Sequence, residues 1–252
     1  MKNSTACTKA LTALQKTLDT DATIAFPDQD DPIAVLVQSF LIWETSAEKA
    51  LSAYEKLRQA VVDFNDLRIC MPHEVVAFIG SSYPRALDRC QRMRAALRDI
   101  YLREHAVSLE RLIGLGKRDA RKYIETLDGV TPFIAERLMV LSFGIHGMPV
   151  DDQLRTHLIE AGVLEEGTEI PEAVSWLTRQ IKSAASRETY IGLQAWGEQQ
   201  ASASKPKRKK TTTKKTTKKT TTKKTSRKKT TTAKKTSSGS GSKKKSSSKK
   251  SS

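Results

Sequence analysis

The sequence predicts an all-α protein of about 200 residues, followed by a basic tail that we expect to be disordered. Apolar residues recur at helical spacing over most of residues 1–200, and no strand or hairpin pattern interrupts them. Charge changes at the end of this stretch, because residues 201–252 hold 21 Lys and Arg and no Asp or Glu. The preceding residues carry the other 23 basic side chains and all 28 acidic ones. We therefore predict two domains, 1–200 and 201–252.

Local start signals support several of the predicted helices. Asp31 and Pro32 form an N-cap and first-turn pair ahead of the apolar stretch 33–43, which predicts a central buried helix. Thr45 with Glu48 resembles a capping box, and predicts a second helix that ends near residue 64. The same periodicity predicts further helices at about 72–79, 84–104, 117–126, 132–143, 152–161 and 172–195.

The tail has the composition of a segment that cannot fold alone. It repeats Lys-Lys-Thr-Thr, and beyond Pro206 its only apolar residue is Ala233, so burial cannot offset the entropy of ordering it. Cations at this density release counterions from a polyanion, which predicts binding to the DNA backbone without sequence readout. RNA binding, or a tail that serves only solubility, stays an alternative. The predicted phosphate contacts begin with Lys205, Lys207, Arg208, Lys209 and Lys210.

Residues 117–143 predict two helices joined by a tight turn. Gly129 permits a backbone that a side chain would obstruct, Thr131 can cap the second helix, and Pro132 suits its first position. Unpaired amides at a helix N-terminus bind anions. We therefore expect Gly129, Val130 and Thr131 to bind a DNA phosphate, with an ordinary, well-capped helical hairpin as the alternative.

This segment resembles a known motif. The sequence Leu127-Asp-Gly-Val-Thr-Pro-Phe-Ile-Ala135 is similar to the helix-hairpin-helix of endonuclease III-like DNA glycosylases, whose pattern is Leu-Pro-Gly-Val-Gly, two residues, a small residue and Ala. The segment 148–155 resembles the following Val-Asp-Thr-His segment, and residues 33–50 resemble the long buried helix of that family and its following turn. The resemblance covers about residues 30–165 and implies a helix-hairpin-helix glycosylase-like fold.

The resemblance also implies roles for individual residues. It places Asp151 at the catalytic aspartate, although Asp151 is equally suited to cap the helix that follows. The lysine that gives some members lyase activity is replaced by Phe133, so we expect no Schiff-base lyase. The glutamine that fills the space left by the flipped base falls at Leu41, either an apolar wedge in the DNA or a core residue.

Cofactors are not expected. Residues 152–252 contain no cysteine, so the iron-sulfur cluster of many relatives is absent. The three cysteines, Cys7, Cys70 and Cys90, lack metal-like spacing and predict reduced, mostly buried thiols.

No apolar run approaches the roughly 18 residues of a membrane span, so we expect no membrane partner. We expect a cytoplasmic, nucleoid-associated protein, and the sequence leaves its oligomeric state open.

Arginines crowd the helix predicted at 84–104. Arg85, Arg89 and Arg92 are spaced to share one face, which could follow a phosphate backbone. The alternative is a solvated helix surface on which arginines pair with neighbours such as Asp88.

Two functional hypotheses follow for a protein that binds double-stranded DNA. The first is an enzyme, a monofunctional DNA glycosylase of base-excision repair that uses Asp151 and water. The second is a glycosylase-like fold without catalysis that binds DNA as an architectural or nucleoid-associated protein. A weaker third option is an RNA-binding tail joined to a domain that binds other proteins.

Overall fold

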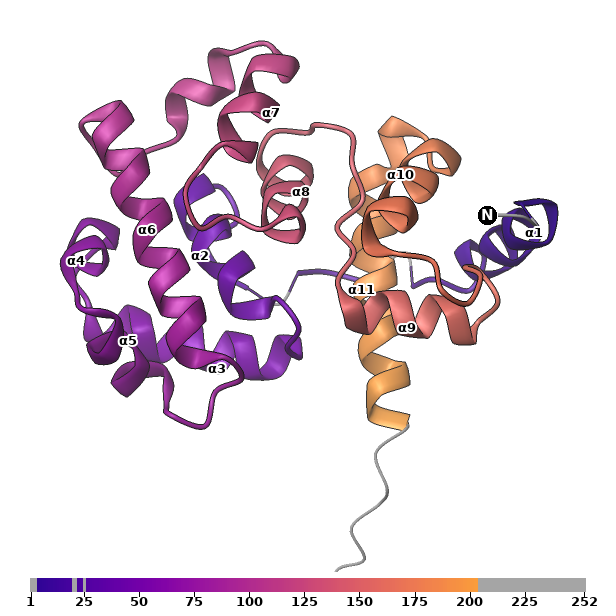
Figure 1. Cartoon of the computed structure of the whole chain (residues 1–252), viewed down its shortest axis with the longest axis horizontal. Coiled ribbons are helices and arrows are strands. Elements are labelled where there is room, and N and C mark those ends of the chain that lie inside the picture. Colours follow the sequence, from indigo (N-terminus) through magenta and orange to yellow (C-terminus); the bar gives the residue numbers. More distant parts are fainter. Residues whose placement is uncertain (1–3, 20–21, 25, 204–252) are drawn as a thin grey trace, which may run out of the picture. The chain divides into compact units, whose positions relative to one another are not determined.

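The computed structural model describes residues 4–19, 22–24 and 26–203. Contacts divide the chain into Met1–Lys207 and Arg208–Ser252. Within the described ranges all regular secondary structure is helical, which confirms the predicted all-α class (Figure 1). The predicted phosphate contacts of the tail lie outside the described residues, namely Lys205, Lys207, Arg208, Lys209 and Lys210.

The centre of the fold is α2 (Pro32–Ile42), in which every residue is buried. Its N-terminus begins as predicted, because the Asp31 carboxylate accepts a hydrogen bond from the Ile33 amide at 2.8 Å. Three helices pack against α2, namely α3 (Ala47–Ala60), α6 (Ala86–Glu104) and α8 (Pro132–Ser142). The apolar run of the sequence is therefore a core helix.

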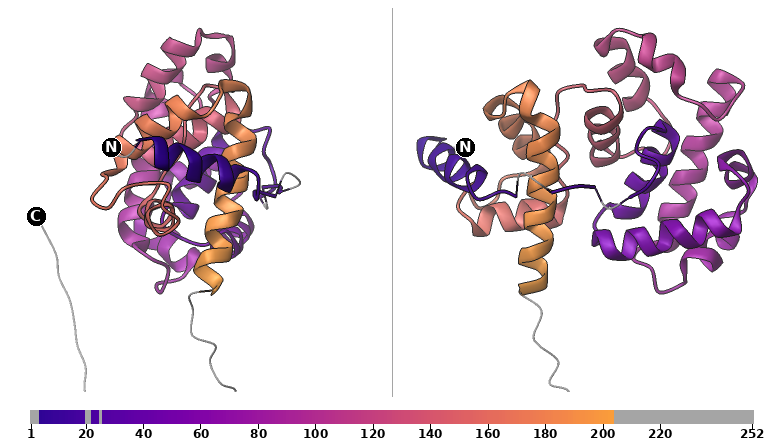
Figure 2. Two further views of the ribbon diagram at one scale, coloured as in Figure 1. Left: turned by 90° about the vertical axis from the view of Figure 1, so that its right-hand side faces the viewer. Right: turned by 180° about the vertical axis from the view of Figure 1, so that it is seen from behind.

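Shorter helices complete this side of the fold. Both α4 (Phe64–Ile69) and α5 (Pro72–Ile79) pack on α6, and α5 also contacts α3 (Figure 2). A 3-10 turn (Glu110–Gly114) leads into α7 (Lys117–Glu125), which packs against α8 as the hairpin prediction requires.

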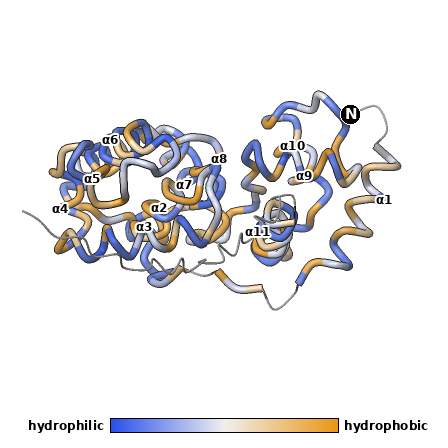
Figure 3. The backbone as a smooth tube through the Cα atoms, turned by 90° about the horizontal axis from the view of Figure 1, so that it is seen from below, coloured by the Kyte–Doolittle hydropathy of each residue, from blue (hydrophilic) through white to orange (hydrophobic). Residues whose placement is uncertain are grey.

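The remaining helices form a second group. In it α9 (Asp152–Glu160) contacts both α10 (Ile170–Gln180) and α11 (Ser186–Ala203), and α11 also reaches α8 (Figure 1). The N-terminal helix α1 (Ser4–Gln15) alternates hydrophobic and hydrophilic residues (Figure 3). It buries its apolar side, and its Thr8 hydroxyl donates to the Gln180 side chain of α10 at 3.4 Å.

Two local predictions were wrong. The single helix expected at 172–195 is broken between α10 and α11, where Ile181 is buried and the Ser186 hydroxyl donates to the Gly147 carbonyl at 2.5 Å. The capping box at Thr45 does not form, because the Thr45 hydroxyl bonds the Trp43 carbonyl at 3.4 Å instead. The helix break depends on a tertiary contact, whereas the Thr45 hydroxyl is used by a local one.

Among the described residues, no helix is both long enough and apolar enough to cross a membrane.

Candidate active site and DNA-binding hairpin

The turn between α7 and α8 rests directly on the backbone of α6. Gly129 has a φ of 75°, and a Cβ atom at this position would lie 2.5 Å from the Arg92 carbonyl oxygen. Both the positive φ and the close approach require glycine. A side chain at position 129 would obstruct the turn, as the sequence predicted, because the turn contacts the backbone of α6.

Several amides of the hairpin have no acceptor within the described part of the chain. The Thr131 hydroxyl accepts weakly from the Ile134 amide at 3.5 Å, and the Val130 amide donates to Leu127 at 3.3 Å. No acceptor is found for the amides of Gly129, Thr131 and Phe133 among the described residues. The turn therefore keeps amide groups available for an external anion, although the Val130 amide is used internally.

Asp151 begins α9 and is held by two amides from different parts of the chain. Its Oδ1 accepts from the Leu154 amide at 2.9 Å, and its Oδ2 accepts from the Glu44 amide at 3.1 Å. The N-cap role considered for Asp151 is therefore confirmed. A carboxylate has about four lone-pair sites, so two acceptor sites remain for a water molecule or a developing cation.

Burial raises the pKa of Asp151 above its usual range, since desolvation disfavours the ionised form. The two amide hydrogen bonds lower this pKa, while the nearby Glu44 carboxylate raises it. Burial is the largest of these effects. The carboxylate is thus partly removed from water but fixed by donors that favour its anionic form.

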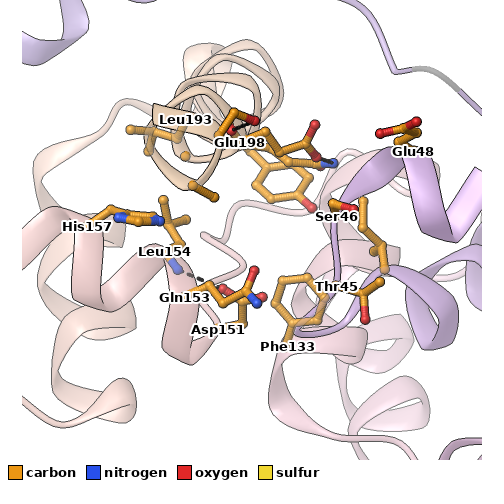
Figure 4. Close-up of a pocket in the computed structure, with 16 residues that line it drawn as sticks. Thr45, Ser46, Glu48, Phe133, Asp151, Gln153, Leu154, His157, Leu193 and Glu198 are labelled. Carbon is orange, nitrogen blue, oxygen red and sulfur yellow. Dashed lines mark hydrogen bonds between the residues drawn. The ribbon is translucent and has the colours of Figure 1, made fainter. Parts of the chain in front are cut away.

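Asp151 lines a pocket of about 140 Å³ that is formed by the end of α2, by α3, α8, α9 and α11, and by the loop before α3 (Figure 4). This volume is close to the ~150 Å³ of a protein cavity that takes up benzene. The apolar and aromatic part of the lining comprises Ile42, Phe133, Leu154, Tyr190 and Leu193. Polar side chains complete it, among them Thr45, Ser46, Glu48, Gln153, His157, Gln194 and Glu198.

Among the described residues, no lysine or arginine lines this pocket. Phe133, which occupies the position counted for the lyase lysine, borders the same pocket as Asp151 and is 8% exposed (Figure 4). Burial raises the pKa of the Tyr190 hydroxyl to about 12, so that group stays protonated at neutral pH. The described part of the pocket therefore offers a fixed carboxylate beside aromatic walls and no amine nucleophile.

The wedge interpretation of Leu41 is wrong. Its side chain is fully buried in α2, and its carbonyl accepts a hydrogen bond from the Tyr83 hydroxyl at 2.7 Å. A side chain inside the core cannot enter DNA, so the core alternative for Leu41 holds. The position inferred from the resemblance falls inside α2, where the last residue, Ile42, lines the pocket and Leu41 does not.

The arginine face of α6 is only partly exposed. Arg89 is fully buried, and its guanidinium donates to the Trp43 carbonyl at 2.7 Å and the Leu41 carbonyl at 3.1 Å, so it cannot follow a phosphate backbone. Arg85 pairs with Glu44 and Arg92 pairs with Asp88, each at 2.9 Å. The expected ion-paired surface is therefore present, and one arginine is a core residue.

Sequence reasoning missed three residues at this site. Glu44 contributes its amide to Asp151, Tyr190 lines the pocket, and Glu198 both lines it and accepts from the Ala47 amide at 3.1 Å. Glu44 is more than a hundred positions from Tyr190 and Glu198 in the sequence. No local pattern joins them, so only the packing of α11 against α8 and α9 could have identified them.

Comparisons with known proteins agree on the fold. No protein-family model matches the sequence, and no curated protein matches it. A trapped endonuclease III–DNA covalent intermediate is similar in structure, with a TM-score of 0.60, 14% identity, and coverage of 81% of this chain and 88% of that one. The 8-oxoguanine glycosylase/lyase of Clostridium acetobutylicum with double-stranded DNA gives 0.58, at 13% identity, and coverage of 77% and 70%.

Two further neighbours have different substrates in their names. A thermostable thymine-DNA glycosylase matches with a TM-score of 0.55 at 18% identity, covering 78% of this chain and 86% of that one. The 3-methyladenine DNA glycosylase of H. pylori, bound to 1,N6-ethenoadenine, gives 0.54 at 15% identity, covering 77% and 96%. The chain has the fold of the helix-hairpin-helix DNA glycosylases, as the sequence resemblance implied.

Proposed function

We propose that this protein is a monofunctional DNA glycosylase, which removes a damaged or mismatched base from double-stranded DNA by hydrolysis. The observation that carries the proposal is Asp151, an oriented carboxylate in a pocket of about 140 Å³, on a glycosylase fold. Enzymes that act on a base in a duplex must first rotate it out of the stack into such a pocket.

Asp151 acts on the sugar rather than on the base. As the glycosidic bond breaks, its electron pair leaves with the base and positive charge develops on the sugar. The fixed carboxylate stabilises this charge, and one of its remaining lone pairs orients the attacking water. The water oxygen bonds the anomeric carbon, and its proton passes to the carboxylate or to solvent.

Phe133 stands at the position of the lyase lysine, so the proposed enzyme has no Schiff-base lyase activity. A bifunctional glycosylase attacks the sugar with an amine, and the described residues that line the pocket include neither lysine nor arginine. The product is therefore an intact strand with an abasic site. The Phe133 ring, with Tyr190, offers an apolar surface on which a planar base can pack.

Two elements bring DNA to this pocket. The amides of Gly129 and Thr131 bind one phosphate at the hairpin, and the basic tail, from Lys205 onward, binds the backbone without sequence preference. Because residues 1–200 carry five more acidic than basic side chains, the tail supplies the long-range attraction that these residues lack. Such a protein acts on chromosomal DNA in the cytoplasm, where it associates with the nucleoid.

The test is a panel of duplexes that each contain one lesion, such as uracil or thymine opposite guanine, an oxidised pyrimidine or an alkylated purine. Alkali treatment after incubation converts abasic sites into strand breaks. We expect breaks with at least one lesion and none with Asp151→Asn. The asparagine variant removes the charge and keeps one oxygen for the Leu154 cap, and a denaturation curve checks that it is folded, because it loses the hydrogen bond from the Glu44 amide.

The second candidate is a DNA-binding protein of the same fold without catalysis. It is favoured by the structural use of Asp151, since both carboxylate oxygens already accept backbone amides. In that case Asp151 is only a helix cap. Tight binding that is independent of lesions, without abasic product from any duplex of the panel, would support this candidate.

A further inference from the structure

The loop that touches Asp151 has an unusual backbone. Residues 43–46 join α2 to α3, and Glu44 in this loop has a φ of 53°. Few residues other than glycine adopt this conformation, and it persists only where the surroundings enforce it. The amide that this conformation presents is the one that donates to Asp151 Oδ2 at 3.1 Å.

The partner of Glu44 shares this feature. Arg85, at the start of α6, has a φ of 50°, and its guanidinium donates to the Glu44 carboxylate at 2.9 Å. Only four non-glycine residues of the described chain have a positive φ, and these two bond each other. Arg85 also lies over the ring of Trp43, 4.3 Å from its centroid, so it holds two successive residues of the loop.

The next turn of α6 holds the other side of the loop. The buried Arg89 guanidinium donates to the Trp43 carbonyl at 2.7 Å, to the Thr45 hydroxyl at 3.3 Å, and also to the Phe40 carbonyl. Thr45 itself lines the pocket. Arg85 therefore contacts Trp43 and Glu44 of the loop, and Arg89 contacts Trp43 and Thr45.

We propose that Glu44 and Arg85 are positioning residues for the carboxylate of Asp151, and that their ion pair keeps the Glu44 amide on that carboxylate. This role rests on the proposed glycosylase function. The pair does not touch the substrate, since neither residue lines the pocket. It acts by fixing the loop, so that Asp151 is ionised and oriented before DNA arrives.

The alternative is an ordinary surface ion pair. Such pairs contribute little to stability when exposed, and the side chains of Arg85 and Glu44 are 45% and 24% exposed. A purely structural pair would change folding stability slightly and leave Asp151 unaltered. The ionisation of Asp151 therefore separates the two possibilities.

Several charged or titratable groups bear on Asp151. Glu44 of the loop donates its amide to Asp151, and Glu48 of α3, His157 of α9, and Tyr190 and Glu198 of α11 line the same pocket. The Glu44 carboxylate raises the pKa of Asp151, while its amide lowers that pKa. Loss of Arg85 leaves the Glu44 charge without its counterion and frees the loop, and both changes raise the pKa of Asp151 further.

The experiment measures the Asp151 carboxyl in the full-length protein by ¹³C NMR during a pH titration. We expect Arg85→Gln to raise the pKa of Asp151 in the parent protein, where it breaks the ion pair with Glu44. The double variant should match Glu44→Gln alone, because the pair is already broken in that single variant, whereas an equal rise in both backgrounds would show that Arg85 does not act through Glu44. Arg92→Gln is the matched control, because Arg92 belongs to the same helix and pairs with Asp88 rather than Glu44.

Arg85→Gly is a second variant that tests the ion pair in case Arg85→Gln destabilises the fold. Glycine tolerates a φ of 50°, so this variant loses the ion pair while relieving the backbone, and it should also raise the pKa of Asp151. Single-turnover excision below that pKa should fall about tenfold for each unit of increase. Equal pKa values in the parent, Arg85→Gln and Arg85→Gly proteins would overturn the proposal.

The outcome also separates this proposal from the proposed function. If the pKa values move as expected but no protein, including the parent, removes any base from the lesion panel, the positioning of Asp151 is supported and the glycosylase function fails. If bases are removed while Arg85→Gln and Arg92→Gln behave alike, the function stands and the role of the pair is refuted.

Discussion

Both α8 and α9 begin with a side chain that caps the helix N-terminus, but the two caps differ in charge. Thr131 caps α8 with a neutral hydroxyl at 3.5 Å, whereas Asp151 caps α9 with a carboxylate at 2.9 Å. A helix N-terminus carries partial positive charge. At α9 a side chain of the protein takes up this charge, and at α8 amides remain without an acceptor in the described chain.

The two helix N-termini are therefore suited to different roles. The open end at α8 suits an anion from outside, such as a DNA phosphate. The end at α9 instead favours the anionic form of Asp151 against its burial. The same local structure thus gives either a binding site or an oriented carboxylate, and the identity of the cap residue decides which.

Removal of the charged cap should have the largest effect. Asp151→Asn should lower single-turnover excision by about 10²-fold or more, because the charge that stabilises the sugar cation is lost. Asn keeps one oxygen for the Leu154 amide but cannot also accept from the Glu44 amide, so Asp151→Asn should lose about 1–3 kcal/mol in unfolding free energy, and Asp151→Ala, which loses both hydrogen bonds, should lose more. Chemical denaturation and excision rates, compared for both variants, check this. Normal excision by a folded Asp151→Asn protein would contradict the role of the charge.

The same carboxylate gives a pH dependence with a definite sign. Because burial raises the folded-state pKa above the ordinary value of 3.8, the folded protein binds the Asp151 proton more tightly than the unfolded chain. The contribution of this group to stability is therefore present below pH 3.8 and is lost as pH rises through the raised pKa. Excision requires the ionised form and should rise over the same interval. A rate without this acid limb would contradict the role of Asp151.

Deletion of residues 204–252 should separate DNA binding by the tail from DNA binding at the N-terminus of α8. This change removes all 21 basic residues of the tail, which lie at positions 205 and beyond, and keeps α11 intact. The slope of log affinity against log salt should become much shallower, by about 0.9 for each phosphate that the tail neutralises. The slope that remains measures binding by the folded domain, including the hairpin. An unchanged slope would refute the role of the tail.

Gly129→Ala should break the hairpin. Alanine there meets both the positive φ and the Arg92 backbone, so we expect a loss of about 1–3 kcal/mol in unfolding free energy and weaker DNA binding. The matched control is Gly162→Ala, where φ is 70° but no atom lies within 4 Å of the added Cβ. The control should lose about 1–2 kcal/mol, from the backbone conformation alone, and keep its DNA affinity. Similar DNA affinities for the two variants would argue against a phosphate at the hairpin.

Asp128→Asn should have the smallest effect, in the opposite direction. Asp128 is an exposed carboxylate beside the amides that are proposed to bind phosphate, so its removal should tighten DNA binding about two- to fivefold. Fluorescence anisotropy of the tail-deleted protein at low salt can resolve such a change. Weaker binding by the asparagine variant would place the phosphate elsewhere.

The fold could be predicted because most of its helices carry local signals. The apolar run of α2, the cap at Asp31 and the turn at Gly129 are each explained by neighbours in sequence, and the structure confirms them. The break between α10 and α11 has no such signal, because it depends on burial of Ile181 and on the contact of Ser186 with Gly147.

The candidate site was predictable only in part. Asp151 and Phe133 could be placed because each lies within a segment that resembles a known motif. Glu44, Arg85 and Tyr190 could not, since they meet Asp151 or its loop only through tertiary packing. Leu41 shows the limit of counting along the chain, because the counted position falls within α2, where every residue is buried.

The most direct test of the central claim is the state of the DNA strand after reaction with a duplex that carries the preferred lesion. We predict that the strand stays intact until alkali is added, that Asp151→Asn gives no breaks even then, and that borohydride traps no covalent protein–DNA adduct. A trapped adduct, or breaks that form without alkali, would show an amine nucleophile at work and would contradict hydrolysis directed by Asp151.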